Sequence, residues 1–165
     1  MSAAFPPLIA AAVLLCTLTA GFLLGFAVVV MPGLRALDDA HYLRAFQVID
    51  GVIQRGQPLF GLMWVGSVIA IVGALVTGLP ILAGGDRLLL SAAGALYLLG
   101  VQLPTAVVNI PLNNAVQRLD VDGLDAAGAQ AARRDFEGRW NRWNAIRTVV
   151  AIAVSALLIV LTTGF

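Results

Sequence analysis

Four long apolar runs occupy most of this 165-residue chain, and they restrict its possible folds more than any other feature. The runs cover residues 7–30, 58–83, 87–110 and 146–165. Each is long enough for the ~20 residues that a helix needs to cross the hydrocarbon core of a bilayer. Charged residues make up 12% of the chain, about half the usual share in a soluble domain. We therefore predict an all-α fold, a four-transmembrane-helix bundle that forms a single membrane domain over residues 1–165.

The arginines predict how the bundle is oriented. All ten basic residues are arginine; nine lie in or beside the two long connections, and Arg87 alone lies in the short one. Because positive loops stay in the cytoplasm, we expect the long connections there and both termini outside, in a bacterial inner or plasma membrane. The expected partner is thus the lipid bilayer. The net charge of +1 argues against nucleic-acid binding, which needs a basic surplus.

Both long connections contain helix patterns of their own. Residues 39–55 place apolar side chains on one face, which predicts a cytoplasmic amphipathic helix after the first span, with Asp38 or Asp39 as its N-cap. Residues 123–147 predict a polar helical extension that leads into the fourth span. Because proline cannot donate a backbone hydrogen bond, we expect Pro32 and Pro111 to end the first and third helices.

Polar side chains follow one face of the third apolar run. They recur every three or four residues and are Gln102, Thr105, Asn109 and Asn113. Amide groups are costly in hydrocarbon unless they form hydrogen bonds, so this face should point into the bundle. Two interpretations remain open: the amides join helices to one another, or they line a polar pocket.

A second polar face begins the fourth span. It carries Trp140, Asn144 and Arg147, with Trp143 beside them. The tryptophans fit an interfacial aromatic belt, and the arginine can extend outward to headgroups or turn inward to bind an anion. The alternative is a pocket at the cytoplasmic mouth of the bundle, with the 39–55 helix as its lid. Its candidate ligand-binding residues are Asn109, Asn113, Trp140, Trp143, Asn144 and Arg147.

Two side chains near this mouth could act as a general acid or base, those of His41 and Asp50. They lie nine residues apart on the predicted helix and so face roughly opposite ways, which prevents them from acting as a pair. With one histidine, one distant cysteine and no clustered carboxylates, the sequence predicts no metal site.

The same polar segments resemble a known family. They are Met31–Leu34, Ala45–Asp50 leading to Pro58–Phe60, Asn109–Asn113 and Trp140–Arg147. In this order, over essentially the whole chain, they are similar to the anthrone oxygenase-like membrane proteins. Asp50 departs from the pattern, in which we expect asparagine. The resemblance implies four membrane helices and the oxygenation of an anthrone methylene to a carbonyl with O2.

Such a reaction needs an apolar slot, a base and hydrogen-bond donors for a phenolate oxygen. Candidate donors are Asn109, Asn113, Asn144 and Arg147; Trp140 and Trp143 are candidates for ring stacking, and His41 or Asp50 for the catalytic base. The expected ligand is a small aromatic or quinone-like molecule. O2 would be a co-substrate, and the sequence requires no further cofactor.

Two other classes of function remain open. A non-catalytic membrane protein could bind a small ligand or dock a partner with the same residues. A transporter would ordinarily need more helices or an oligomer, because four spans leave little room for alternating access. The glycines of the first two spans, Gly21, Gly25, Gly66 and Gly73, permit homodimer contacts and serve packing within one chain equally well.

Overall fold

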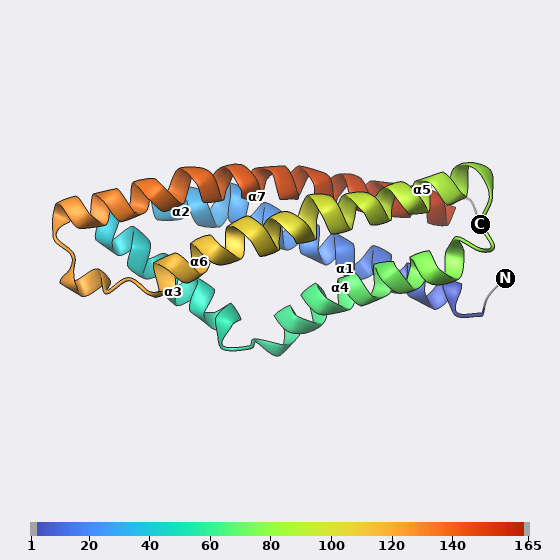
Figure 1. Cartoon of the computed structure of the whole chain (residues 1–165), viewed down its shortest axis with the longest axis horizontal. Coiled ribbons are helices and arrows are strands. Elements are labelled where there is room, and N and C mark those ends of the chain that lie inside the picture. The colour runs from blue at the N-terminus through green and yellow to red at the C-terminus, as the bar shows by residue number, and fades with distance from the viewer. Residues whose placement is uncertain (1–2, 164–165) are drawn as a thin grey trace.

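The computed structural model describes residues 3–163, and these form a bundle of four membrane-length helical rods. The rods are Phe5–Arg35, Pro58–Gly78, Gly84–Gln117 and Ala126–Thr163. They confirm the predicted all-α, four-span fold. The start of α1 and the end of the fourth rod lie at the same end of the bundle (Figure 1), as an even number of spans requires.

Two of the rods are composite helices. The first consists of α1 (Phe5–Gly25), the π-helix η1 (Phe26–Val30) and α2 (Met31–Arg35). The third consists of α5 (Gly84–Ala95), η2 (Leu96–Gln102), η3 (Thr105–Asn109) and α6 (Ile110–Gln117), in which η2 and η3 are π-helical. Helix α4 (Pro58–Gly78) is the second rod, and α7 (Ala126–Thr163) is the fourth. The connections between rods contain α3 (Asp39–Gln54) and the short η4 (Val121–Gly123).

The prediction that Pro32 and Pro111 end their helices was wrong. Each proline lies in the first turn of an α-helix, α2 or α6, directly after a π-helical segment. The wider turns before the proline give its ring room and change the hydrogen-bond pattern, so that the helix continues. These π-helical segments lie at the level of the cavity described below.

One other helix boundary differs from the predicted one. The second span ends at Gly78 rather than at residue 83, shortly before Pro80, which cannot continue a helix. The fourth rod confirms the predicted polar extension, since the extension and the apolar run form one continuous helix from Ala126. The last two residues of the predicted fourth span, 164 and 165, lie outside the described residues.

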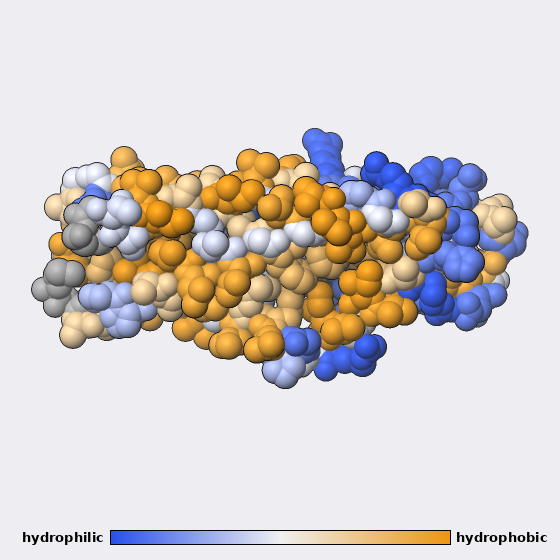
Figure 2. Space-filling model, turned by 180° about the vertical axis from the view of Figure 1, so that it is seen from behind, coloured by the Kyte–Doolittle hydropathy of each residue, from blue (hydrophilic) through white to orange (hydrophobic). Residues whose placement is uncertain are grey.

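Helix α1 packs against both α4 and α7, and α7 also packs against the third rod and α3. An apolar band covers most of the outer surface, and polar side chains gather at the end remote from the termini (Figure 2). With 38 residues, α7 is about 57 Å long, whereas the hydrocarbon core is ~30 Å thick. Its first turns therefore project beyond the membrane and form, with α3, α6 and η4, a polar head.

The head has its own apolar core. Tyr42 and Phe46 of α3 are buried against Phe136 and Trp140 of α7. Asp38 caps α3, since its carboxylate accepts the backbone N–H of His41. The amphipathic helix expected at 39–55 is thus α3, and it covers the end of the membrane bundle.

Candidate functional site

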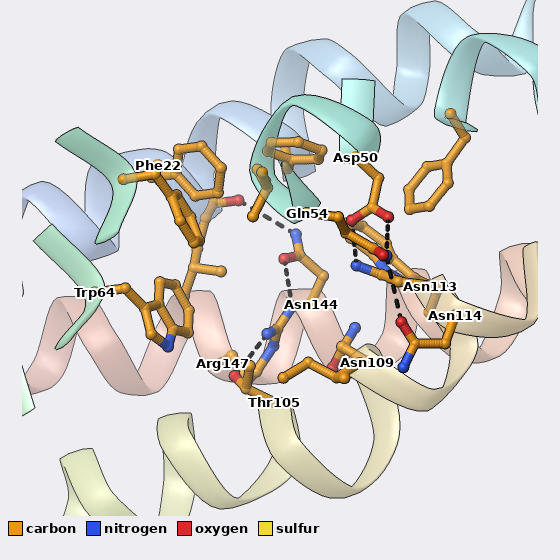
Figure 3. Close-up of a pocket in the computed structure, with 17 residues that line it drawn as sticks. Phe22, Asp50, Gln54, Trp64, Thr105, Asn109, Asn113, Asn114, Asn144 and Arg147 are labelled. Carbon is orange, nitrogen blue, oxygen red and sulfur yellow. Dashed lines mark hydrogen bonds between the residues drawn. The ribbon is translucent and has the colours of Figure 1, made fainter. Parts of the chain in front are cut away.

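A cavity of about 370 Å³ lies where the membrane bundle meets the head. Its volume falls at the lower end of the ~300–1,000 Å³ typical of small-molecule sites. Residues of α1, α3, α4, the third rod and α7 line it (Figure 3). The lining residues are Phe22, Leu23, Phe26, Phe46, Asp50, Ile53, Gln54, Phe60, Trp64, Thr105, Asn109, Ile110, Asn113, Asn114, Trp140, Asn144 and Arg147.

Arg147 supplies a buried positive charge to one side of this cavity. It is only 3% exposed. Its guanidinium donates to two neutral acceptors, Thr105 Oγ1 at 2.7 Å and Asn144 Oδ1 at 3.0 Å, while its Nε has no partner. None of the ion pairs within residues 3–163 includes Arg147. A buried cation without a counter-ion is costly, so this arrangement favours an anionic or strongly dipolar ligand.

Asn109 lies beside this charge with its hydrogen-bonding capacity unused. The residue is 2% exposed, and neither its amide nitrogen nor its amide oxygen has a partner among the described residues. Figure 3 shows the side chain pointing into the cavity near Arg147. An amide that joins helices would be bonded to a neighbour. Asn109 is therefore free to bind a ligand.

Asp50 supplies a buried negative charge on the other side. Its Oδ2 accepts hydrogen bonds from Gln54 at 2.7 Å and Gln117 at 2.9 Å, and its Oδ1 accepts one from Asn113 at 2.8 Å. Asn113 in turn accepts the indole N–H of Trp140 at 2.7 Å. These bonds fix the carboxylate in place. Since a carboxylate oxygen has two lone pairs, Oδ1 keeps one acceptor position for a ligand.

Aromatic rings form the apolar walls between the two charges. Phe22 packs against Phe26 and Phe60, with ring centroids 5.0 and 5.3 Å apart, and Phe60 stacks on Trp64 at 5.5 Å. Trp140 is 4% exposed and packs on Phe26, which places it inside the protein rather than in an interfacial belt. A flat apolar molecule with polar groups at opposite ends matches this shape and polarity.

Six of the eight candidate site residues meet around the cavity: Asp50, Asn109, Asn113, Trp140, Asn144 and Arg147. The other two do not line it. His41 is exposed on the head, where its ring lies 2.6 Å from Asp38; its backbone N–H and its ring hold the pKa of Asp38 below the usual value. Trp143 is partly buried on α7, beside Trp140 and Arg147 on the helix surface, but it does not line the cavity.

The family comparison identifies the chain. The sequence profile of the anthrone oxygenase family matches residues 50–157, about two thirds of the protein. The chain belongs to the anthrone oxygenase family. No curated protein and no solved structure matches it. The matched region starts at Asp50 and includes all the cavity residues of α4, the third rod and α7.

The cavity of this anthrone oxygenase family protein includes residues that were not predicted from the sequence. Phe22 of α1 and Phe26 of η1 form one i, i+4 aromatic pair in the first rod, and Phe60 and Trp64 form another in α4. That repeated spacing was the available signal. Conversely, Gln102 belongs to the predicted polar stripe but lies outside the cavity, beside Tyr97.

The polar groups around the cavity of this anthrone oxygenase family protein are amides, one guanidinium, one carboxylate, the Thr105 hydroxyl and the Trp140 indole N–H. Within the described part of the chain, no three histidine, cysteine or acidic side chains lie close enough together to hold a metal ion. The chemistry available from the protein's own residues is therefore proton transfer, hydrogen bonding and charge stabilisation.

Asn109→Leu should leave the protein as stable as the wild type, or more so. Removing a buried, unpaired amide relieves a desolvation cost of about 1–3 kcal/mol, and leucine fills a similar volume. Asn113→Leu is the matched control one turn further on; it should destabilise the protein, because it breaks the bonds to Asp50 and Trp140. Thermal unfolding in detergent measures both. A large loss of stability for Asn109→Leu would show that this amide joins helices.

Proposed function

We propose that this membrane protein is an oxygenase that converts the methylene of an anthrone-type, three-ring substrate into a carbonyl with O2. One observation carries the proposal: an aromatic-walled cavity has the carboxylate of Asp50 on one side and, on the other, the guanidinium of Arg147, which forms none of the ion pairs among the described residues. An anthrone carries its acidic methylene and its carbonyl oxygen at opposite edges of the central ring. The family to which the chain belongs is consistent with this assignment.

The reaction balances without an external reductant. A base removes one methylene proton, and the resulting carbanion is the enolate of an aromatic phenol, with its charge largely on the oxygen. This electron-rich anion gives electrons to O2, and a carbon–oxygen bond forms at the former methylene. Loss of the second proton and cleavage of the O–O bond then yield the carbonyl and one water molecule. Both electron pairs come from the substrate's C–H bonds.

Each step has a residue suited to it. Asp50 Oδ1 is the proposed proton acceptor, and the amides of Gln54, Asn113 and Gln117 hold it in position. Arg147 and Asn109 are the proposed donors to the enolate oxygen, since both have unused N–H groups inside the cavity. Donors that are already oriented stabilise developing charge without reorganisation, and this is commonly the largest contribution to catalysis.

The orientation in the membrane is part of the proposal. The polar head contains most of the arginines, which favours a cytoplasmic head with both termini on the opposite side of an inner or plasma membrane. The cavity would then lie near the cytoplasmic surface. In that position its substrate could come from cytoplasmic synthesis or from the bilayer.

The test is turnover of 1,8-dihydroxyanthrone by purified protein in lipid vesicles. Oxygen uptake should exceed the spontaneous rate, and mass spectrometry with isotopically labelled O2 should find one labelled oxygen in the new carbonyl. Empty vesicles give the background rate, and a chelator-treated sample tests for a metal requirement. A rate equal to the background would contradict the proposal and favour the second candidate function, a non-catalytic protein that binds the same class of ligand in this cavity.

A further inference from the structure

The wall of the cavity that faces the head is closed by hydrogen bonds between α3 and the α6–η4 segment. Gln47 Nε2 donates to the carbonyls of Val116 at 2.8 Å and Leu119 at 3.0 Å, and Gln117 donates back to the Gln47 carbonyl at 3.0 Å. Nearer the cavity, Gln54 donates to Asn114 at 3.3 Å. These bonds hold α3 in place as a cover, so that passage from the aqueous side would require several of them to break.

An ion pair adds to this closure. Arg44 of α3 pairs with Asp122 of η4 on the outside of the head, away from the cavity lining. The pair joins the cover to the loop before α7. These two positions are also suited to a cross-link that holds α3 against η4 without altering the cavity lining.

The wall that faces the bilayer is open by comparison. Helix α4 packs against α1 and α5, and its main contacts include neither η3 nor α6. Figure 1 shows α4 diverging from the third rod as it approaches α3. At this position Phe60 of α4 and Ile110 of α6 line the cavity, and Ile110 is also 46% exposed on the outside. Ile110 therefore lies at an opening between α4 and α6.

The surroundings of this opening are apolar. Leu59 on α4 is 72% exposed and Val107 on η3 is 57% exposed, both within membrane-spanning rods. A molecule that leaves the cavity here passes exposed apolar side chains of two membrane-length rods. Gln54 and Asn114 border the same opening on the α3 side, at the level where the spans begin.

From these features we infer that the ligand enters sideways from the bilayer, between α4 and α6, as a neutral, lipid-dissolved weak acid. The inference rests on the proposed function for the aromatic nature of the ligand and adds its physical state and route. Such an acid crosses the apolar opening uncharged and loses its proton only inside, between Asp50 and Arg147. A permanently charged analogue would have to carry its charge through the apolar opening, at a large desolvation cost.

The experiment measures occupancy rather than turnover. The probe is 1,8-dihydroxyanthraquinone, which does not react further and quenches tryptophan fluorescence; Trp64 and Trp140 both line the cavity. Stopped-flow mixing with protein in vesicles gives the binding rate at a fixed total probe concentration and several lipid-to-water ratios. The rate should follow the amount of probe per lipid, and the water-confined anthraquinone-2-sulfonate should not bind. A rate that follows the aqueous concentration, equal binding of the sulfonate, or no binding of either probe would overturn the inference.

Two sets of variants test the route itself. Ile110→Trp should slow probe arrival by about tenfold or more, within the range by which association rates vary among variants of one site. Val149→Trp is the control, since it adds the same ring at a lipid-exposed position of α7 that does not line the cavity. Equal rates in these two variants would contradict passage beside Ile110.

The second set of variants immobilises α3, the helix that covers the cavity. Joining Arg44→Cys to Asp122→Cys with a bifunctional thiol reagent should leave the arrival rate unchanged, with the unreacted double variant as reference. A strong slowing would instead show that α3 must lift and that the ligand arrives from water. Because all these measurements use a product-like probe, absence of oxygenation would leave the route standing, and a failed route would leave measured turnover standing.

Discussion

Arg147→Met should lower kcat on an anthrone by about 10²–10³-fold, the usual effect of removing one donor to a developing oxyanion. The substitution should not unfold the protein. Arg147 has no carboxylate partner, so methionine removes a buried charge whose desolvation is costly. The lost hydrogen bonds to Thr105 and Asn144 offset part of that gain. The expected unfolding temperature therefore equals or exceeds that of the wild type.

A lower kcat with unchanged or higher stability distinguishes a functional arginine from a structural one. Arg142→Met on the exposed face of the same helix is the control, and it should change neither kcat nor stability. Turnover is followed as oxygen uptake in vesicles, and unfolding is followed in detergent. If Arg147→Met kept wild-type kcat, or lost much of its stability, the guanidinium would be a structural link between α7 and η3.

Asp50→Asn should lower kcat by about 10²–10⁴-fold, the contribution typical of a positioned general base. The amide keeps the size of the carboxylate but cannot take up the methylene proton. Binding of 1,8-dihydroxyanthraquinone should change much less than kcat, because the proposed contacts to the carbonyl oxygen come from Arg147 and Asn109. Steady-state turnover and fluorescence quenching measure the two quantities separately.

His41→Gln is the matched control for this prediction, because His41 was the other candidate base. Its ring is exposed and paired with Asp38, so its loss should leave kcat unchanged. The family resemblance led us to expect asparagine at position 50, which makes the comparison informative. Full activity in Asp50→Asn would assign proton removal to another acceptor and leave Asp50 a structural role.

The membrane fold could be predicted from sequence because span length and hydropathy decide it almost alone. No soluble fold accommodates four apolar runs of this length. The positions of helix ends were harder to predict, as Pro32 and Pro111 show. A proline ends a helix only if the chain cannot rearrange its hydrogen bonds, and the π-helical segments η1 and η3 make that rearrangement here.

The site residues were predicted correctly where the chain keeps regular α-helical spacing. Thr105, Asn109 and Asn113 share the cavity as expected, while Gln102 does not, because η3 intervenes and wide turns shift the angular position of the residues before it. Phe22 and Trp64 were not selected, because their i, i+4 spacing to Phe26 and Phe60 does not by itself show which way the rings face. Their role depends on how α1 and α4 pack against each other, which periodicity within one helix does not determine.

Helix α7 places Trp140, Asn144 and Arg147 on one uninterrupted rod that also crosses the bilayer. Such a helix responds to a thinner or thicker membrane mainly by changing its tilt. Because α4 is a separate and shorter helix whose main contacts with the third rod are with α5, away from the cavity, it need not tilt by the same amount. The acyl-chain length of the surrounding lipid thus acts on the relative positions of the cavity walls, and membrane thickness becomes a physical variable that tunes the site.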